Sequence, residues 1–434
     1  MKLEDFLCRN AEIYGDKTAV TNGSRQLSYR QLYDEVTRRA SQLDVSGRLV
    51  PFRASQSIDF LMEYFSAHLA GGVAVPLEKD LSDVALRQYS DVCSSSSVPA
   101  DTADVLFTTG TTGTPKGVVI SHRTIVANAE NLVEAQGYCH DTAFIINGPL
   151  NHIGSLSKIY PVVMVGGTIH IIDGMKDMDA FFRAVDAAEG KVATFLVPAS
   201  IRMLLAFAGE KLASCCDKID FIETGAAPIS QTDMQRLCAV LPKSRLFNTY
   251  ASTETGIVAT FNFNEGECLA GCLGKAMRNS SFFVASDGRI ACGGKTLMSG
   301  YLNDEAHTAA VLYDAAVHTA DYGYVDDGGR LHLTGRSGDV INVGGYKVVP
   351  SEVEDVAMSL PMVKDCICVA ASHPVLGQVL KLLVVVADGF SLDRRLLAQT
   401  LKEQLESYKV PLAYESVDMV KRTFNGKLDR KAYR

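Results

Sequence analysis

The stretch TTGTTGTPKG, residues 108–117, decides how the rest of this chain is interpreted. Threonines alternate with glycines around Lys116, directly after the apolar run 105–107. Glycines let a backbone approach phosphates and expose N–H donors, threonines add O–H donors, and a lysine supplies a cation. The composition therefore favours a polyphosphate-binding loop. The alternative is a polar surface hairpin between two strands.

This loop differs from the Walker A phosphate loop. The Walker A pattern places GK[ST] directly before a helix, whereas here Pro115 precedes Lys116 and Gly117 follows it. Proline and glycine favour a loop over a helix start at this point. A different class of phosphate-binding site is therefore indicated.

Length and composition indicate a globular protein of about two to three domains. The chain has 434 residues, of which 47% are hydrophobic, so it can bury a large core. No run approaches the roughly 18 uncharged apolar residues of a membrane span, and residues 1–5 lack a secretory pattern, so we expect a cytoplasmic protein. The net charge of −8 provides no basic surface for nucleic acid, so local cations must meet any anionic ligand.

The eleven cysteines show no spacing typical of a metal site or of a thiol oxidoreductase. Cys215 and Cys216 are adjacent, and Cys366 and Cys368 alternate within an apolar segment. We therefore expect buried, reduced thiols.

Helices and strands are predicted to alternate along the first part of the chain. A first helix carries apolar residues at helical spacing: Leu32, Val36, Ala40 and Leu43. Residues 58–70 form a second helix, and 71–77 a buried strand. After the glycine-rich loop, 118–120 is a strand and Ser121 caps a helix that ends at Gly137. Such alternation indicates layered α/β structure.

Six further motifs follow in order, each of them ordinary on its own: PLNHIGS (149–155), FIETGAAP (221–228), NTYASTET (248–255), TADYGY (319–324), LHLTGR (331–336) and NGKLDR (425–430). Together with the loop at 108–117 they resemble the signature motifs of the AMP-forming adenylating enzymes. This superfamily includes acyl-CoA synthetases, carrier-loading adenylation domains and luciferases. Ala251 and Ala320 stand where the motifs usually have glycine. Pro350 and the glycine pair before it resemble the form found in acyl- or aryl-acid CoA ligases.

The resemblance implies an α/β fold in two domains. Residues 1–336 would form a large N-terminal domain of layered α/β sheets with a small β-barrel-like part, holding the ATP and acid sites. Residues 340–434 would form a small, mobile α+β lid with a catalytic lysine, joined through a hinge at 337–339. Gly338 matches the hinge position and accepts both signs of φ, although an ordinary turn glycine would look identical.

The resemblance also implies a nucleotide site. Tyr250 would stack on adenine, Asp321 would accept both ribose hydroxyls, and Arg336 would contact ribose and phosphate. The complete expected ATP/AMP set is Thr108, Thr109, Gly110, Thr111, Thr112, Gly113, Thr114, Lys116, Gly225, Ala226, Ala227, Tyr250, Thr253, Asp321 and Arg336.

Four residues are expected to act in catalysis: Lys427, Glu254, Thr253 and Lys116. By resemblance, Glu254 would hold Mg²⁺, Thr253 would bind the α-phosphate, Lys116 would lie at the pyrophosphate side, and Lys427 between carboxylate and α-phosphate. Taken alone, Glu254 is also compatible with a solvated surface acid, and Lys427 with an exposed turn.

The acid would bind at the PLNHIGS motif, where His152, Ile153 and Gly154 are expected to line the acyl pocket. A single histidine is also common as a structural group. Amino-acid-activating relatives place an aspartate in this segment, but 147–158 contains no acid, so an ammonium would lack a partner. Lys158 either pairs with a second carboxylate of the substrate or is a solvated helix residue, and the solvated position is preferred.

The predicted activity is ATP-dependent activation of a small carboxylic acid to acyl-AMP, with release of pyrophosphate, followed by transfer to the thiol of coenzyme A. ATP, Mg²⁺ and CoA are the implied cofactors. Gly344 and Gly345 would line the thiol tunnel. The alternative is a stand-alone enzyme that loads the acid onto the pantetheine arm of a carrier protein.

Overall fold

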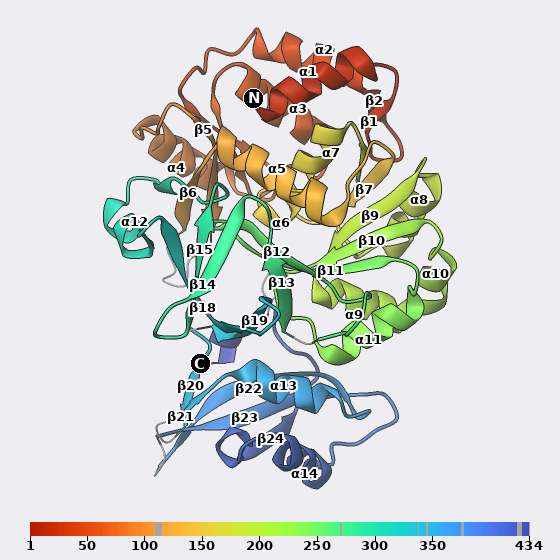
Figure 1. Cartoon of the computed structure of the whole chain (residues 1–434), viewed down its shortest axis with the longest axis vertical. Coiled ribbons are helices and arrows are strands. Elements are labelled where there is room, and N and C mark those ends of the chain that lie inside the picture. The colour runs from red at the N-terminus through yellow and green to blue at the C-terminus, as the bar shows by residue number, and fades with distance from the viewer. Residues whose placement is uncertain are drawn as a thin grey trace.

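The computed structural model describes residues 1–108, 115–269, 271–336, 338–343, 346–374, 377–422 and 428–433, and the side chains of these residues except 347, 377 and 431. Within these ranges no helix combines the length and the apolar character that a membrane crossing requires. A large part with two sheets carries a smaller C-terminal unit at one end (Figure 1).

The larger sheet has a parallel centre. Its parallel strands, in spatial order, are β1 (Thr18–Thr21), β8 (Thr168–Ile171), β7 (Thr142–Ile146), β9 (Lys191–Leu196), β10 (Ile219–Thr224) and β11 (Arg245–Ser252). Antiparallel strands flank them: β2 (Gln26–Ser28) beside β1, and β12 (Gly256–Asn262) beside β11. The turn of small residues after β10, 225–227, and the turn after β11 therefore lie near one edge, because parallel neighbours end on the same side.

The second sheet holds the strands on both sides of the glycine-rich loop. Its order is β16 (Gly300–Tyr301), β6 (Lys116–Ser121), β5 (Thr102–Thr108), β4 (Val73–Leu77) and β3 (Leu49–Arg53). β5 and β6 pair antiparallel, so the loop joins them as a hairpin. Helix α4 (Asp83–Ser94) packs on this sheet through a separate apolar cluster that includes Cys93.

Helices fill the space between the two sheets: α1 (Leu3–Ile13), α2 (Tyr29–Ala40), α3 (Ile58–Leu69), α5 (His122–Gln136) and α7 (Ile159–Val165). Other helices cover the far face of the larger sheet: α8 (Met178–Ala187), α9 (Pro198–Phe207), α10 (Gly209–Ser214) and α11 (Gln231–Val240). β7 shows why both faces are buried, since Phe144 and Ile146 join the inner core while Ala143 and Ile145 join the outer one. The predicted layered α/β architecture is confirmed.

The local predictions around the loop are confirmed as well. Ser121 accepts a hydrogen bond from the Thr124 N–H at the start of α5, and Gly137 ends the helix with φ 67°. The first predicted helix is shorter than expected. α2 ends at Ala40, and Leu43 lies beyond it with 39% of its surface exposed.

The part expected to resemble a small β-barrel is open. It consists of β13 (Cys272–Ala276), β14 (Ser280–Val284), β15 (Arg289–Gly294), β17 (Leu312–Tyr313), β18 (Ala316–Val325) and β19 (Leu331–Arg336). These strands continue the larger sheet antiparallel from β12 through β13, and β14 lies at its outer edge. Since β14 and β12 do not pair in the path of the sheet, the strands form no closed barrel. Short helices complete the large part: α6 (Ile153–Leu156) and α12 (Glu305–Val311).

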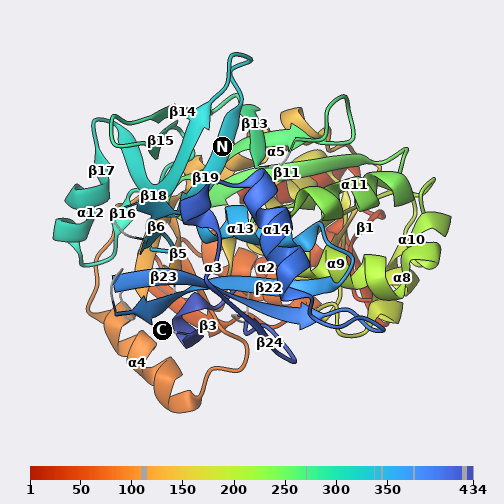
Figure 2. The same cartoon turned by 90° about the horizontal axis from the view of Figure 1, so that it is seen from below.

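The C-terminal unit has its own core and an α+β composition. A hairpin of β20 (Ile341–Val343) and β21 (Tyr346–Val348) precedes α13 (Pro350–Met358). The sheet is β22 (Val363–His373), β23 (Gly377–Val386) and β24 (Ala413–Ser416), with α14 (Arg394–Gln404) and the 3-10 turns η1 (Ser407–Lys409) and η2 (Arg430–Tyr433). Val353, Cys368 and Leu401 contribute to an apolar cluster confined to this unit. Seen from below, its sheet and helices extend across the end of the large part (Figure 2).

An ion-pair bridge joins the two parts. Arg202 of α9 lies 3.0 Å from Asp233 of α11 and 3.2 Å from Asp365 of β22. Asp365 also pairs with Arg422 at 2.7 Å. The bridge crosses the predicted domain boundary, so it contributes to the orientation described here.

Candidate active site

The hairpin β5–β6 positions the first predicted nucleotide-binding residues. Thr108 ends β5 opposite Lys116, the first residue of β6, and its hydroxyl lies 3.5 Å from the Lys116 carbonyl oxygen. Of the ten residues of the loop, 109–114 lie outside the described residues. The predicted roles of Thr109, Gly110, Thr111, Thr112, Gly113 and Thr114 therefore stay predictions.

Lys116 and Glu254 meet at one tyrosine. The Lys116 Nζ lies 5.1 Å from the centre of the Tyr301 ring, and the Tyr301 hydroxyl donates to Glu254 Oε1 at 3.1 Å. Burial, together with the Glu254 carboxylate, raises the pKa of Tyr301. Two residues predicted to act on phosphate and metal thus share one neighbour. The sequence motifs did not single out Tyr301.

Glu254 and Thr253 lie in the tight turn between β11 and β12. The Met298 N–H donates to the Glu254 carbonyl oxygen at 2.9 Å, which anchors the turn on the neighbouring segment. The Ser252 N–H bonds to the Thr255 hydroxyl at 3.1 Å across the same turn. Ala251, found where glycine was expected, lies at an irregularity in the β11–β12 register without a positive φ. Alanine is therefore tolerated there.

A second cluster joins Tyr250, Asp321 and Arg336. The Tyr250 hydroxyl donates to Asp321 Oδ2 at 2.8 Å, and Arg336 Nε lies 3.2 Å from Asp321 Oδ1. Only 6% of Tyr250 is exposed, and burial with the nearby Asp321 raises its pKa well above the ordinary value. Tyr250 therefore stays neutral and donates its proton. The structure brings together the residues predicted for adenine and ribose.

The turn after β10 requires small residues. A Cβ at Gly225 would lie 2.8 Å from the Thr249 carbonyl oxygen, closer than real Cβ atoms approach backbone. Ala226 follows with φ 66°, which is uncommon for a residue other than glycine and often marks a functional site. Gly225, Ala226 and Ala227 thus form a turn of small residues at the end of β10, and their contact with the nucleotide stays a prediction.

Phe195 links this turn to the predicted acyl pocket. His152 precedes α6, and Ile153 and Gly154 are its first residues. A Cβ at Gly154 would lie 3.5 Å from the Phe195 ring, and one at Gly225 would lie 3.6 Å from it. The segment predicted for the acid therefore lies beside the segment predicted for adenine. Sequence reasoning did not single out Phe195 as a site residue, and no local signal distinguished it.

The interpretation of Lys158 as a solvated residue is wrong. Its side chain is 1% exposed, and its Nζ lies 2.7 Å from Glu223 Oε1, itself fully buried in β10. Nζ also lies 5.2 Å from the centre of the Phe195 ring. Burial lowers the pKa of Lys158, and Glu223 opposes that shift. Tertiary contact thus gives Lys158 a protein carboxylate as its partner.

The predicted hinge and thiol residues are described only in part. Gly338 lies two residues after Arg336, and the next residue, Asp339, donates its N–H to the Arg336 carbonyl oxygen at 2.9 Å. A Cβ at Gly338 would meet nothing within 4 Å. Gly344, Gly345 and Lys427 lie outside the described residues, and so does residue 337 of the predicted hinge.

Two family descriptions match the chain. "AMP-binding enzyme" matches residues 7–98 and 88–302, and "AMP-binding enzyme C-terminal domain" matches residues 352–427.

Among curated proteins, indoleacetate–CoA ligase of Aromatoleum aromaticum is 27% identical over 99% of this chain and 96% of its own length. Feruloyl-CoA synthase of an Amycolatopsis species is 27% identical over 97% of this chain and 96% of its own. With 4-coumarate–CoA ligase 3 of Oryza sativa, 26% identical, the match covers 77% of this chain and 64% of the relative. The match thus covers nearly the full length of the first two relatives and less than two thirds of the length of the third.

Solved structures share the fold. The ATP-bound crystal structure of MatB from Rhodopseudomonas palustris superposes with a TM-score of 0.88 at 22% identity, covering 100% of this chain and 98% of that one. o-Succinylbenzoate CoA synthetase from Bacillus subtilis, in complex with its acyl-adenylate intermediate, gives 0.85 at 22% identity, covering 99% and 97%.

Proposed function

The chain belongs to the AMP-binding enzyme family, and on this premise we propose that it is an acid:CoA ligase that works through an acyl-adenylate. In the first step a carboxylate oxygen attacks the α-phosphorus of ATP, and the bond to the β-phosphate oxygen breaks to release pyrophosphate. In the second step the thiol sulfur of CoA attacks the acyl carbonyl carbon and AMP leaves. The observation that carries the proposal is the cluster in which Asp321 contacts both Tyr250 and Arg336.

Electrostatics explains the residues that the first step requires. Carboxylate and triphosphate are both anions, so their approach requires cations placed in advance. Lys116 would hold the pyrophosphate side and Lys427 would lie between carboxylate and α-phosphate. Thr253 would donate to the α-phosphate, and Asp321 and Arg336 would hold the ribose.

Glu254 suits a magnesium ion. A half-buried carboxylate beside a phosphate-binding lysine is the oxygen ligand that this hard cation prefers. Tyr301 engages Oε1, which leaves Oε2 as the ligand that would face the metal. When bound, Mg²⁺ would neutralise phosphate charge.

We also propose the division into residues 1–336, a hinge at 337–339 and a lid at 340–434. The separate apolar cluster of the C-terminal unit supports this division. A lid that reorients would bring Lys427 to the phosphate for the first step and the segment of Gly344 and Gly345 to the thiol for the second. The cytoplasmic location stays a prediction from the sequence.

The acid is proposed to lack an α-ammonium group. The segment 147–158 carries no acid, and Glu223, the carboxylate that contacts Lys158 of this segment, is already neutralised by that lysine. A buried ammonium would therefore lack a partner. Because the similar curated proteins are named for indoleacetate, ferulate and 4-coumarate, aromatic acids are the first to test.

Pyrophosphate release should be measured across aryl, short-chain and dicarboxylic acids and α-amino acids, with and without CoA. We expect turnover with a carboxylic acid that lacks an α-amino group, and this turnover should require CoA. We expect no pyrophosphate exchange that depends on an α-amino acid. Glu254→Gln should lower the rate by about 100-fold or more, whereas the exposed Glu267→Gln serves as a matched control and should not. Robust amino-acid exchange would falsify the substrate class. Activity with a pantetheine-loaded carrier protein but not with CoA would favour the alternative, carrier loading.

A further inference from the structure

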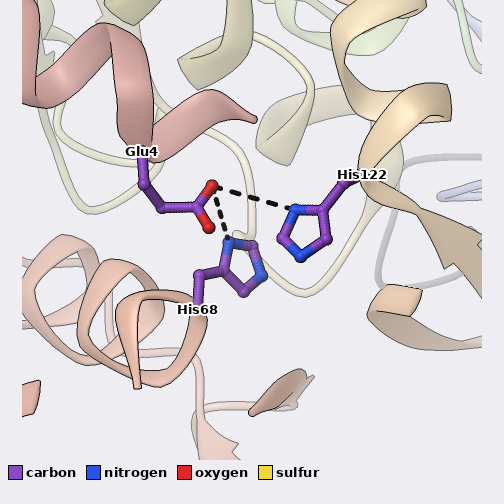
Figure 3. Close-up of side chains that lie close together, drawn as sticks. All are labelled: Glu4, His68 and His122. Carbon is purple, nitrogen blue, oxygen red and sulfur yellow. Dashed lines mark ion pairs between the residues drawn. The ribbon is translucent and has the colours of Figure 1, made fainter. Parts of the chain in front are cut away.

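Glu4, His68 and His122 converge on one point outside the candidate active site (Figure 3). They come from α1, α3 and the first residue of α5, three helices far apart in the sequence. Glu4 Oε2 lies 3.9 Å from His68 Nδ1 and 3.8 Å from His122 Nδ1, and the three atoms lie within 4.8 Å of one another. Neither the nucleotide nor the acid site uses these residues.

The three atoms are buried and unsatisfied. Glu4 is 6% exposed, His68 2% and His122 5%. Among the described residues, Glu4 Oε2, His68 Nδ1 and His122 Nδ1 all lack a hydrogen-bond partner. Buried polar atoms are nearly always paired, so three orphaned atoms that face one another indicate a missing ligand.

The surroundings fix the tautomer of His68. Its Nε2 lies 2.9 Å from Asp104 Oδ1 and 3.1 Å from the Ala103 carbonyl oxygen. Both of these oxygens only accept, so Nε2 carries a hydrogen, and deprotonation of the ring would leave the lone pair of Nδ1 facing the cluster. Asp104 is in turn held by the hydroxyl groups of Tyr64 at 3.0 Å and Tyr160 at 3.3 Å. A carboxylate that orients a histidine through its far nitrogen is the usual outer shell of a metal ligand.

The spacing suits a small cation. A point exists within about 2.5 Å of all three atoms, a few tenths of an ångström beyond the roughly 2.0–2.2 Å of zinc bonds to histidine and carboxylate. Two imidazoles and one carboxylate form a known zinc ligand set, and imidazole disfavours Mg²⁺ and Ca²⁺. We propose that Glu4, His68 and His122 bind one divalent transition-metal ion, best Zn²⁺, that ties α1 to α3 and α5. The competing occupant is a water molecule.

The test starts with metal content. Protein expressed without an affinity tag should carry about one Zn²⁺ per chain, as measured by inductively coupled plasma mass spectrometry. After chelation, ZnCl₂ should raise the melting temperature, because an ion that binds only the folded state stabilises it. CoCl₂ should give the visible absorption band of a low-coordinate histidine site.

Variants separate the site from adventitious binding. Glu4→Gln and His122→Gln keep similar volume and should each weaken Zn²⁺ binding by more than the roughly 10–100-fold typical of losing an outer-shell partner. His307→Gln, which changes an exposed histidine paired with Asp304, is the control and should bind like the wild type. Since the wild type and all three variants are compared by direct Zn²⁺ titration and circular dichroism, a variant that misfolds is recognised. A wild type that is metal-free and binds Zn²⁺ no more tightly than folded Glu4→Gln would overturn the proposal in favour of water.

Discussion

The Nζ of Lys158 and Oε1 of Glu223 form an ion pair of 2.7 Å in which the two side chains are 1% and 0% exposed. The pair joins the segment after α6 to β10, beside the Phe195 ring that lies between the predicted acid and adenine segments. Opposite charges in a medium of low polarity depend on each other, because each compensates the lost hydration of its partner. The pair is therefore neutral as a whole, and removal of either member leaves one buried charge without its partner.

Lys158→Met should lower the free energy of unfolding by about 3–5 kcal/mol, because it leaves the Glu223 carboxylate buried and unpaired. The double variant Lys158→Met with Glu223→Met should lose much less than the sum of the single losses. Chemical denaturation of the four proteins measures the coupling. Lys243→Met is the control. It removes a contact of equal length, 2.7 Å, from the exposed ion pair of Lys243 with Asp217, and it should change the free energy of unfolding little. A Lys158 variant no less stable than this control would contradict the mutual dependence.

Lys427→Ala should slow formation of acyl-AMP by orders of magnitude. Loss of a cation that stabilises the transition state costs about 3–4 kcal/mol by analogy with oxyanion donors. Thioester formation from supplied acyl-AMP should largely survive. In acyl-AMP the bond between the α-phosphorus and pyrophosphate is already broken, so this step does not require the cation that the first step needs. Single-turnover assays of each half-reaction test this. Equal loss in both would assign Lys427 a role other than the proposed one.

Gly338→Pro should damage the two half-reactions unequally. Proline fixes φ near −65° and would hold the lid in one orientation if the pivot lies here. Gly338→Ala is the matched control, because a Cβ at this position meets nothing within 4 Å. We expect at least about a tenfold difference between the half-reactions for proline and almost none for alanine. Equal rates for both half-reactions in folded Gly338→Pro would place the pivot elsewhere.

The orientation of the C-terminal unit should depend on pH through Asp355 of α13. Burial, followed by Glu354 and by Asp233 of the large part, raises its pKa from 3.8 to about 7 against the lowering effect of Arg202. Because Asp233 and part of the burial belong to this arrangement alone, it binds the Asp355 proton more tightly than the separated unit would, and it weakens as the pH rises towards about 7.

Small-angle scattering at pH 5.5 and pH 8 tests that dependence. The wild type should populate the described arrangement more at pH 5.5, and Asp355→Asn should remove the difference. Asp388→Asn changes a carboxylate that is 98% exposed in the same unit and should keep it. A pH response unchanged in Asp355→Asn would exclude this carboxylate as its source.

Local patterns in the sequence were sufficient for the architecture around the loop. The run before TTGTTGTPKG became β5, the run after it became β6, and Ser121 and Gly137 begin and end α5. These outcomes depend on neighbouring residues, because strand period, capping and left-handed φ are set within a few positions. The order of the motifs indicated the family for the same reason, since each motif is a short contiguous segment.

Tertiary structure alone decided which side chains meet. Lys158 and Glu223 are 65 positions apart, Tyr301 and Glu254 are 47 apart, and no periodicity in the sequence links either pair. The sequence therefore predicted Lys158 as solvated, although the fold buries it. The convergence of His68 and His122 with Glu4 was likewise invisible, because a metal site formed by three helices has no spacing signature. Distant residues become neighbours only when the sheets and helices of the fold pack together.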